Sequence, residues 1–370
     1  MLLVVNAGSS SIKLAVFDPA LEQVAWARVT EIGPQARLEG EGRRETLALP
    51  DHTAAMAAAL QALGLTPAAL QGAAHRVVHG GAGLVAPCRI TPEVEAAIAD
   101  CIPLAPLHNP ANLTGIGAVT ALAPDLPQYA SFDTAFHATN PEVATAYALP
   151  AAERARGIRR YGFHGLSYAA LIARLGERVP GRLLACHLGN GASLCAIRDG
   201  RSVATTMGYS PLDGLTMGTR TGSIDGNAVL RLAELHGIDG AARILNREGG
   251  LQALGGASDM RALRAAGATF ALDHFAYWAI RHAGSMVAAM GGLDAIAFTG
   301  GIGENDAAMR ATIVEGLGFL GAALDPAANA ANARDLTAPG AHVAIWTVPA
   351  EEERQIAREA MGLIARKESA

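Results

Sequence analysis

Two glycine- and serine-rich turns in this sequence contain the residue types that bind phosphate groups. The first runs from Asn6 to Ser11 and is followed by Lys13, and the second runs from His187 to Ser193. Backbone N–H groups in such turns point outward and attract anions, and serine hydroxyls and a lysine add further donors. No Gly-Lys dipeptide occurs, and the first turn leads into an apolar strand, which excludes a P-loop. Each turn therefore predicts either a phosphate-binding hairpin or a plain hairpin.

Two arginines beside glycines carry the positive charge that a phosphoryl or carboxylate ligand requires. Arg76 lies shortly before a glycine pair, and Arg220 lies within Gly218–Gly222. A guanidinium forms paired hydrogen bonds with phosphate or carboxylate oxygens, and neighbouring glycines let a ligand approach the backbone. His164 stands between glycines and follows two arginines, so its imidazole is suited to stabilising developing negative charge. A surface arginine or a structural histidine is the alternative at each position.

Acidic residues at two places are candidates for holding a divalent metal ion. Asp133 follows the apolar Phe132, and Glu352 lies in the run Glu351–Glu353. Magnesium is usually held by one or two protein carboxylates together with substrate phosphates. A solvent-exposed helix start explains the glutamates equally well, because acidic side chains are favourable near a helix N-terminus.

The two turns lie in similar strand patterns, which indicates a duplication. The apolar runs Leu2–Val5 and Ile12–Phe17 flank the first turn, and Leu183–Cys186 and Leu194–Ile197 flank the second about half a chain later. Apolar runs on either side of a polar turn predict a β-hairpin. Two such hairpins, each opening one half of the chain, predict two related domains that face each other across a cleft. Coincidental turn chemistry is the alternative.

Helical patterns alternate with these strands and predict an α/β protein. Ala54–Leu63 and Thr269–Met290 have helical periodicity, Thr91 and Pro92 form the start of another helix, and His108 precedes a helix N-terminus. In the second half, the strand Ala295–Phe298 and a glycine-rich turn lead to a helix from about Asp306. The Ala/Asn-rich stretch Ala327–Arg334 predicts weak order.

Length and composition favour a cytoplasmic protein with one long domain or two. The chain has 370 residues, with 51% hydrophobic and 17% charged residues, a balance typical of globular proteins. The net charge of −5 provides no positive field for nucleic acid or an anionic membrane. Four cysteines without a C-x-x-C pair favour a reduced compartment. No secretory signal is present, and no stretch of about 18 residues is free of both charge and turn signals, so we expect neither secretion nor membrane insertion.

Taken together, these segments resemble the acetate kinase family, in the order in which that family has them. The resemblance covers the chain from its first strand to its last helix. The six segments are Val5–Lys13, His75–Gly81, Arg160–Gly165, His187–Ser193, Gly218–Arg220 and Phe298–Asn305. The resemblance implies duplicated ribonuclease-H-like (actin-like) domains facing a central cleft, and a homodimer. It also implies reversible Mg²⁺-dependent transfer of the ATP γ-phosphoryl to acetate, giving acetyl phosphate and ADP. The domains would be residues 1–135 with 353–370, and residues 136–352.

The resemblance further implies a role for each matching residue. Catalytic residues would be Arg76, Asp133, His164 and Arg220, with His164, Arg220 and His108 stabilising the transition state. Asn6 and Glu352 would bind Mg²⁺, with Mn²⁺ as a substitute ion and Asp133 helping to organise the metal. Phosphates and nucleotide would contact Ser9, Ser11, Lys13, His187, Asn190, Gly191, Asp259, Met260, Arg261, Gly301, Gly303 and Asn305. Acetate would lie among Arg76, Val78, Leu107, Phe163 and Pro211.

The sequence also departs from the family pattern. Leu166 and Tyr168 stand where the family usually has threonine and a second histidine, and Ser223 and Gly226 differ from the usual residues after Arg220. Ala350 replaces the usual threonine before the glutamates, and the region between Asp18 and His75 is short. Three alternatives therefore stay open: a propionate or butyrate kinase, a pyrophosphate-dependent carboxylate kinase, and a non-catalytic nucleotide-binding sensor.

Overall fold

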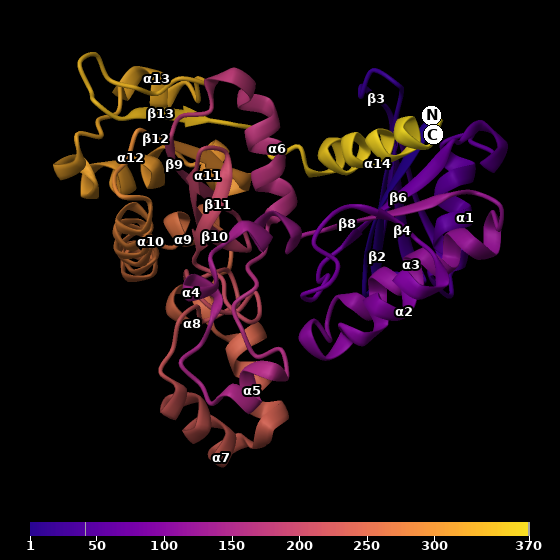
Figure 1. Cartoon of the computed structure of the whole chain (residues 1–370), viewed down its shortest axis with the longest axis horizontal. Helices are drawn as coiled ribbons and strands as arrows, with labels where there is room; N and C mark the ends of the chain where they lie inside the picture. The colour runs from indigo at the N-terminus through magenta and orange to yellow at the C-terminus, as the bar shows by residue number, and fades with distance from the viewer. Residues whose placement is uncertain (41, 369–370) are drawn as a thin grey trace. The chain divides into compact units, whose positions relative to one another are not determined.

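The computed structural model describes residues 1–40 and 42–368. By its internal contacts the chain separates into two compact units (Figure 1). Unit 1 comprises Met1–Phe136 and the segment from Glu351 onward, and unit 2 comprises His137–Ala350. No helix among the described residues is long and apolar enough to cross a membrane.

Unit 1 is built on an eight-stranded sheet with the order β5-β4-β3-β2-β1-β6-β8-β7. Strands β1 and β2 are the expected hairpin and pair antiparallel, whereas β1, β6 and β8 are parallel neighbours. Strands β3, β4 and β5 extend the sheet as an antiparallel meander between Asp18 and His75. The bounds are β1 Leu2–Gly8, β2 Ser11–Phe17, β3 Gln23–Thr30, β4 Gly33–Gly40, β5 Arg43–Leu49, β6 Gly72–Val77, β7 Cys88–Arg89 and β8 Gln128–Phe132.

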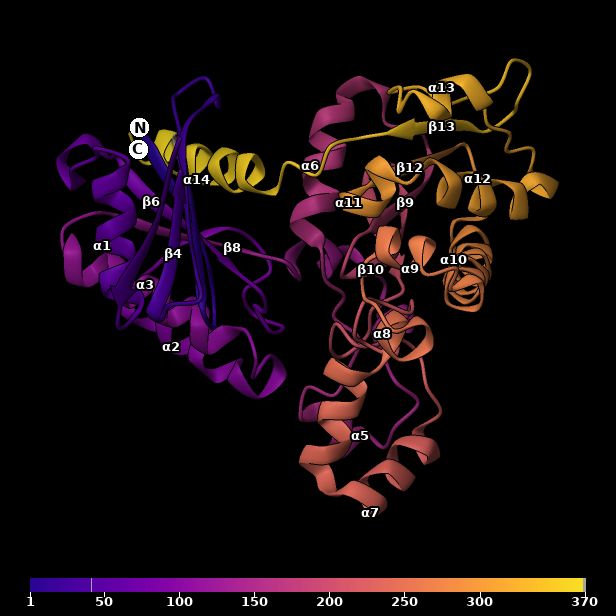
Figure 2. The same cartoon turned by 180° about the vertical axis from the view of Figure 1, so that it is seen from behind.

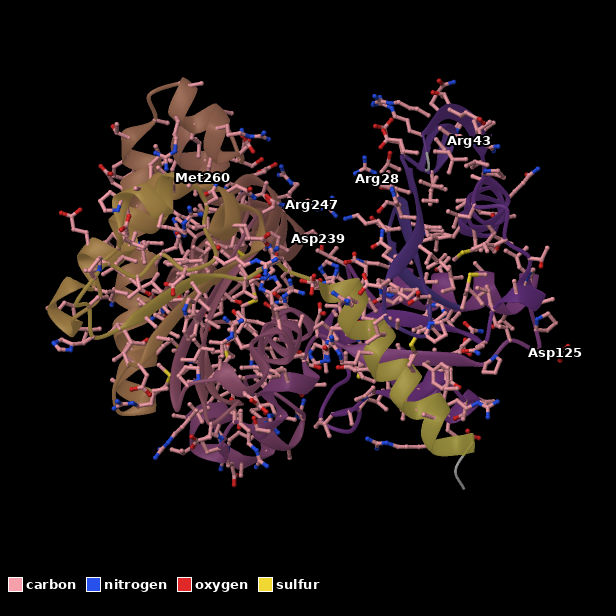
Figure 3. All side chains as sticks on the ribbon, turned by 90° about the horizontal axis from the view of Figure 1, so that it is seen from above. Arg28, Arg43, Asp125, Asp239, Arg247 and Met260 are labelled. Carbon is pink, nitrogen blue, oxygen red and sulfur yellow. The ribbon has the colours of Figure 1, made fainter. Side chains whose placement is uncertain are left out.

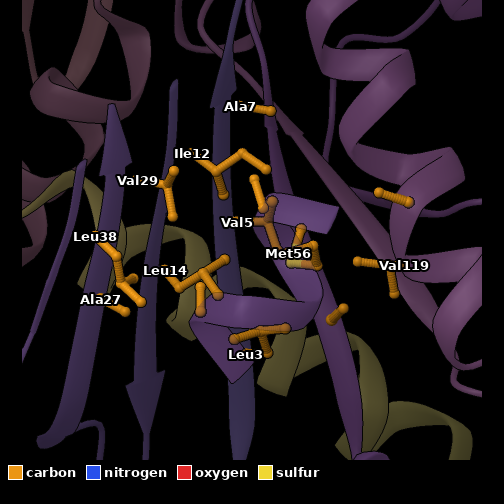
Figure 4. Packing of buried hydrophobic residues seen from close by; sticks show 14 of the residues in the cluster. Leu3, Val5, Ala7, Ile12, Leu14, Ala27, Val29, Leu38, Met56 and Val119 are labelled. Carbon is orange, nitrogen blue, oxygen red and sulfur yellow. The ribbon is translucent and has the colours of Figure 1, made fainter. Parts of the chain in front are cut away.

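Helices cover both faces of the central strands of this sheet. Because both faces are buried, these strands have continuous apolar sequences. Figures 1 and 2 show α1 (His52–Ala62) and α3 (Asn109–Leu122) on one face and α14 (Glu352–Glu368) on the other. Under α1 lies a cluster of buried side chains that includes Leu3, Val5, Ile12, Leu14 and Met56 (Figure 4). The alternating residues Leu2 and Val4 are also buried.

Side-chain caps mark where helices of unit 1 begin. Asp51 accepts a hydrogen bond from the Ala54 amide at the start of α1. Thr91 accepts one from Val94 at the start of α2 (Pro92–Asp100), as its position before Pro92 predicts. Short 3₁₀ turns occur at Pro67–Ala69 (η1) and Ile102–Leu104 (η2).

Unit 2 repeats the central topology of unit 1. Its five-stranded sheet has the order β11-β10-β9-β12-β13, in which β9, β10 and β11 are antiparallel and β9, β12 and β13 are parallel. This matches β3-β2-β1-β6-β8 of unit 1 in order and in strand direction. The bounds are β9 Arg182–Leu188, β10 Ala192–Arg198, β11 Arg201–Thr205, β12 Ala295–Thr299 and β13 Ala344–Thr347. The expected duplicated α/β fold is confirmed.

Ten α-helices occur in the described part of unit 2, several of them short. They are α4 Glu142–Thr145, α5 Ala151–Ala155, α6 Gly165–Leu175, α7 Gly226–Arg243, α8 Gly250–Gly255, α9 Met260–Ala265, α10 Thr269–Met290, α11 Gly300–Asn305, α12 Ala307–Gly316 and α13 Pro326–Ala330. Other helical turns are η4 Gly176–Arg178, η5 Ile244–Glu248, which is a π-helical turn, and η6 Gly318–Leu320, while η3 Ala135–Thr139 begins at the end of unit 1.

The prediction of weak order for Ala327–Arg334 was wrong, because a buried arginine anchors this stretch. Asp325 caps α13 by accepting hydrogen bonds from two backbone amides. Arg310, which is fully buried, donates from Nε to Asn329 Oδ1 at 2.8 Å and from Nη2 to Asn332 Oδ1 at 2.6 Å. The side-chain oxygens of both asparagines therefore accept hydrogen bonds from a buried cation, which fixes the stretch.

Candidate active site

The first predicted phosphate-binding turn is the tip of the β1–β2 hairpin. Gly8 pairs with Ser11 across the two-residue turn, and Asn6 pairs with Lys13 further along the strands. Ser9 and Lys13 are exposed, and the Gly8 carbonyl contacts His52 Nε2 at 2.8 Å. The turn thus presents hydroxyl, ammonium and amide groups at one end of the sheet of unit 1.

Arg76 and Asp133 meet at the carboxyl ends of the parallel strands β6 and β8. Arg76 Nη2 lies 2.6 Å from Asp133 Oδ2, and Nε lies 3.1 Å from Oδ1. Asp133 is only 2% exposed, and its amide donates to the Val77 carbonyl at 3.1 Å. Burial lowers the pKa of Arg76, but attraction to Asp133 and Glu352 outweighs it, so this pKa lies above the usual arginine value.

Glu352, at the start of α14, adds a further carboxylate beside this pair. Burial raises the pKa of Glu352, and repulsion from Asp133 and Glu353 adds to that effect, although Arg76 and Lys13 oppose it. This neighbourhood therefore holds more negative than positive charge at low solvent exposure, which suits an added cation.

The oxygen donors near Arg76 suit a Mg²⁺ ion that is bound jointly by the protein and by a substrate phosphate. Within residues 1–40 and 42–368, no group of three or more His, Cys, Asp or Glu side chains is arranged to hold an ion. Mg²⁺ commonly uses one or two carboxylates and completes its shell with water and substrate phosphate. Asp133 and Glu352 are oxygen donors of that kind, so a metal held jointly with a phosphate ligand is compatible with these residues.

Buried asparagines of α3 fix the loop that follows β6. The Val78 amide donates to Asn112 Oδ1 at 3.0 Å, and the His79 amide donates to Asn109 Oδ1 at 3.2 Å. Val78 is consequently buried and held in place. Leu107 and His108, just before α3, are exposed, and Leu107 is 50% accessible. Sequence reasoning missed both asparagines, although the spacing Asn-Pro-Ala-Asn at a helix start was a visible signal.

In unit 2, the second predicted turn joins β9 and β10 and lies against two histidines. His187 on β9 pairs with Ser193 on β10, and its Nδ1 lies 2.8 Å from Ser167 Oγ. The rings of His164 and His187 are stacked, with centroids 4.1 Å apart and planes at 25°. Two of the predicted site residues are thus in direct contact.

His164 adopts a left-handed backbone conformation, with φ of 59°, immediately before α6. Non-glycine residues rarely adopt this region, and it costs roughly 1–2 kcal/mol, so the surrounding contacts must hold it. His137 Nε2 lies 2.9 Å from the Phe163 carbonyl, and His164 Nδ1 lies 2.9 Å from Ser193 Oγ. Phe163 itself is buried. The backbone and the ring of His164 are therefore both anchored.

Gly191 brings Arg220 and His164 to the same turn. A Cβ atom added at Gly191 would lie 2.9 Å from Arg220 Nη2 and 3.1 Å from His164 Nε2. Arg220 Nη1 donates to the Pro211 carbonyl at 2.6 Å, and burial lowers the pKa of Arg220. No carboxylate pairs with Arg220 in the described part of the chain. A partly buried guanidinium without an anionic partner favours binding of an anionic ligand.

A pocket of about 950 Å³ lies beside this turn in unit 2. Its size suits a nucleoside-sized ligand. Six predicted nucleotide-binding residues line it: Asn190, Asp259, Met260 (labelled in Figure 3), Arg261, Gly301 and Asn305. Gly303 does not line it, because Gly303 is buried and its carbonyl accepts a hydrogen bond from Arg310 Nη1 at 2.9 Å.

Two residues that sequence reasoning missed also line this pocket. Arg264 Nη2 donates to both carboxylate oxygens of Asp306, at 2.8 and 2.9 Å, and Asp306 caps α12 through the Met309 amide. Their separation in sequence left no local signal that they would pair.

The predicted site residues therefore form two groups, one in each unit. Unit 1 contains Asn6, Ser9, Ser11, Lys13, Arg76, Val78, Leu107, His108, Asp133 and Glu352. Unit 2 contains Phe163, His164, His187, Asn190, Gly191, Pro211, Arg220, Asp259, Met260, Arg261, Gly301, Gly303 and Asn305.

Duplicated sheets of this topology, each with a polar hairpin tip, are typical of the actin-like ATPase fold. Comparison with known sequences is more specific: the Acetokinase family profile matches residues 1–358, and the chain belongs to this family. The family comprises enzymes that transfer a phosphoryl group to a carboxyl group and use ATP and ADP as nucleotide substrates.

Relatives match this chain over nearly its whole length. Acetate kinase of Leifsonia xyli is 44% identical over 396 residues, covering 98% of each chain. Among solved structures, Porphyromonas gingivalis acetate kinase has a TM-score of 0.91 and 35% identity, covering 98% of this chain and 99% of that one. A propionate kinase from Francisella tularensis has a TM-score of 0.92 and 32% identity, covering 97% and 98%. Similarity of fold therefore does not distinguish the two carboxylate substrates.

Proposed function

We propose that this protein catalyses reversible phosphoryl transfer from ATP to acetate, producing acetyl phosphate and ADP. The observation that carries the proposal is the arrangement around Gly191, where Arg220 has no carboxylate partner among the described residues and lies close to His164. Such donors stabilise the charge of a transferring phosphoryl group, and that stabilisation is the main task of a kinase site.

In the proposed reaction, a carboxylate oxygen of acetate forms a bond to the γ-phosphorus of ATP. The bond from that phosphorus to the oxygen bridging to the β-phosphate breaks, and ADP leaves with the bonding electrons. Neither acetate nor ADP requires a proton in this step, so we assign no general base. The protein's contribution is to position the reactants and to stabilise charge.

Each group of residues has a separate role in this proposal. Arg76, positioned by Asp133, binds the carboxylate of acetate, and Arg220 and His164 donate to the oxygens of the transferring phosphoryl group. The pocket beside Asn190 binds the adenosine portion. Asn6, Asp133 and Glu352 would hold Mg²⁺, which would neutralise phosphate charge when bound.

The acyl substrate is assigned as acetate because eight relatives at 40–44% identity are all named acetate kinase. The propionate kinase with a similar fold makes propionate the second candidate. We propose that Val78, Leu107, Phe163 and Pro211 contact the methyl group. We also propose a homodimer in the cytoplasm, by analogy with the family.

A hydroxamate assay tests the function directly. Purified protein is incubated with ATP, Mg²⁺ and acetate, propionate or butyrate, and acyl phosphate is trapped with hydroxylamine. We expect acyl hydroxamate with acetate as the best substrate, and none when ATP or the metal is omitted. Activity with pyrophosphate in place of ATP would favour the pyrophosphate-dependent alternative, and a folded protein inactive with all three acids would reject the proposal.

A further inference from the structure

Tyr168 is a buried residue with a polar group close to the site. It lies one turn into α6 with 0% exposure, and its amide donates to the His164 carbonyl at 3.1 Å. Its hydroxyl lies 2.6 Å from Ser193 Oγ, and Ser193 Oγ lies 2.9 Å from His164 Nδ1. Ser193 is also fully buried. A hydroxyl chain thus runs from Tyr168 through Ser193 to the imidazole.

The donor and the acceptor in each of these hydrogen bonds follow from which groups carry a proton. A hydrogen bond between the His187 backbone and the Tyr168 phenol lowers the pKa of the phenol. A hydrogen bond lowers this pKa when it stabilises the deprotonated oxygen, so the phenol oxygen is the acceptor and the His187 N–H is the donor. Burial raises the same pKa more strongly, so the phenol keeps its proton. The Tyr168 O–H is then available to Ser193. Ser193 Oγ accepts it, and among the described residues its other hydrogen-bond partner is His164 Nδ1. Because the buried Ser193 proton would otherwise have no acceptor, Ser193 donates to His164 Nδ1.

We propose that Tyr168 and Ser193 are positioning residues that select, for the neutral form of the His164 ring, the tautomer with its proton on Nε2. This inference rests on the proposed role of His164. Nε2 faces the turn at Gly191, beside Arg220, so this tautomer directs an N–H toward the place assigned to the phosphoryl group. The opposite tautomer would direct a lone pair toward phosphoryl oxygens and repel them. Stacking on His187 holds the plane of the ring.

Nitrogen-15 NMR of the imidazoles tests the tautomer without any substrate. Wild type, Tyr168→Phe and Ser193→Ala are compared at about pH 8, where an ordinary histidine is neutral, and His164→Gln assigns the signals. We expect His164 in wild type to be protonated at Nε2. In Tyr168→Phe, Ser193 is able to accept as well as donate, so we expect signals of both tautomers. A wild-type proton on Nδ1, or an unchanged tautomer in both variants, would overturn the proposal.

Kinetics supply the second readout. We expect kcat of Tyr168→Phe to fall roughly tenfold or more, with the KM for ATP within about twofold, because the substitution alters only transition-state donation. Tyr161→Phe is the matched control, because it removes a tyrosine hydroxyl that donates to the Gly157 carbonyl at 2.9 Å. Equal kcat in wild type and Tyr168→Phe would also overturn the proposal. Failure of the wild-type hydroxamate assay would instead reject the proposed phosphoryl transfer to acetate. The NMR result would still report the tautomer of His164, because it does not depend on activity.

Discussion

Arg76 and Asp133 form a two-point contact in which the Nε and Nη2 edge of the guanidinium faces the carboxylate, at 3.1 and 2.6 Å. Because Asp133 is buried, it fixes the direction of the Arg76 side chain. Among the described residues, Arg76 Nη1 has no hydrogen bond, so a donor remains for a carboxylate or phosphate ligand. The pair explains how a single arginine is both oriented and able to bind a substrate.

Removing the Arg76 side chain should therefore impair both activity and stability. We expect Arg76→Ala to lower kcat/KM at least about 10²-fold, because a preorganised donor to transition-state charge contributes roughly 3–4 kcal/mol. It also leaves the buried Asp133 carboxylate unpaired, which costs about 3–5 kcal/mol of folding free energy. Steady-state kinetics and thermal unfolding measure the two effects. Arg28→Ala is the control, since Arg28 (Figure 3) pairs with Glu39 near the surface. Near-normal kinetics in Arg76→Ala would contradict the role of Arg76 in substrate binding.

Arg220 should require a guanidinium and not only a positive charge. Its Nη1 donates to the Pro211 carbonyl, while Nη2 approaches the turn at Gly191. A lysine ammonium cannot reproduce this planar arrangement, so we expect Arg220→Lys to remain impaired at least about tenfold in kcat/KM. Arg247→Lys, at an exposed position labelled in Figure 3, is the matched substitution. If both variants retain full activity, Arg220 does not contact the phosphoryl group.

The pocket beside Asn190 can be filled at Gly301. Nothing lies within 4 Å of a Cβ added there, so a side chain would extend into open space without disturbing the fold. We expect Gly301→Leu to raise the KM for ATP roughly tenfold, with the KM for acetate within about twofold. Gly318→Leu is the control, because that glycine also has open space but does not line the pocket. An unchanged KM for ATP would show that the nucleotide binds elsewhere.

Val78 is the residue through which we expect to alter the choice of acyl substrate. Shortening its side chain in Val78→Ala makes room for a longer acid, and such a change in an apolar pocket contributes about 1–3 kcal/mol to discrimination. We expect kcat/KM for propionate relative to acetate to rise roughly tenfold, with the KM for ATP nearly unchanged. Val77→Ala is the matched control, because Val77 packs in a separate cluster with Ile98 and Phe132. If the ratio of kcat/KM for propionate to that for acetate is unchanged in Val78→Ala, then Val78 does not contact the acyl group.

Buried histidines should make the protein less stable in mild acid. Burial lowers the pKa of His75 in unit 1 and of His137 in unit 2 to about 4. In the unfolded chain the same groups titrate near 6.5, so between about pH 6.5 and 4 the unfolded state binds more protons and stability falls. From pH 7 to pH 5 we expect a loss of about 2 kcal/mol for each histidine.

Urea unfolding measured across that pH range checks this expectation. His75→Gln should show a shallower dependence on pH than wild type, and a substitution of the exposed His236 to Gln should not change it. A free energy of unfolding that stays constant from pH 7 to pH 5 would show that these histidines have the same pKa in the folded protein as in the unfolded chain.

Much of the fold follows from local sequence patterns. The hairpins at Asn6–Ser11 and His187–Ser193 were predictable because turn residues between apolar runs act over a few positions. The helix after Thr91 was predictable for the same reason, since its cap and Pro92 are adjacent. The meander β3–β5 was not identified, because its strands are partly exposed and lack a continuous apolar run.

Tertiary structure decided which side chains meet. Asn112 donates to the Ala7 carbonyl 105 residues away, and Arg264 pairs with Asp306 across 42 residues. Tyr168 and His164 converge on Ser193 because the packing of α6 against β9 places one helix turn beside that hairpin. Residue types and turn chemistry are local properties of a chain, and they were sufficient to indicate a phosphate-handling protein. The partner of each polar group depends on strand register and helix packing, which arise only when distant segments bury their apolar faces together.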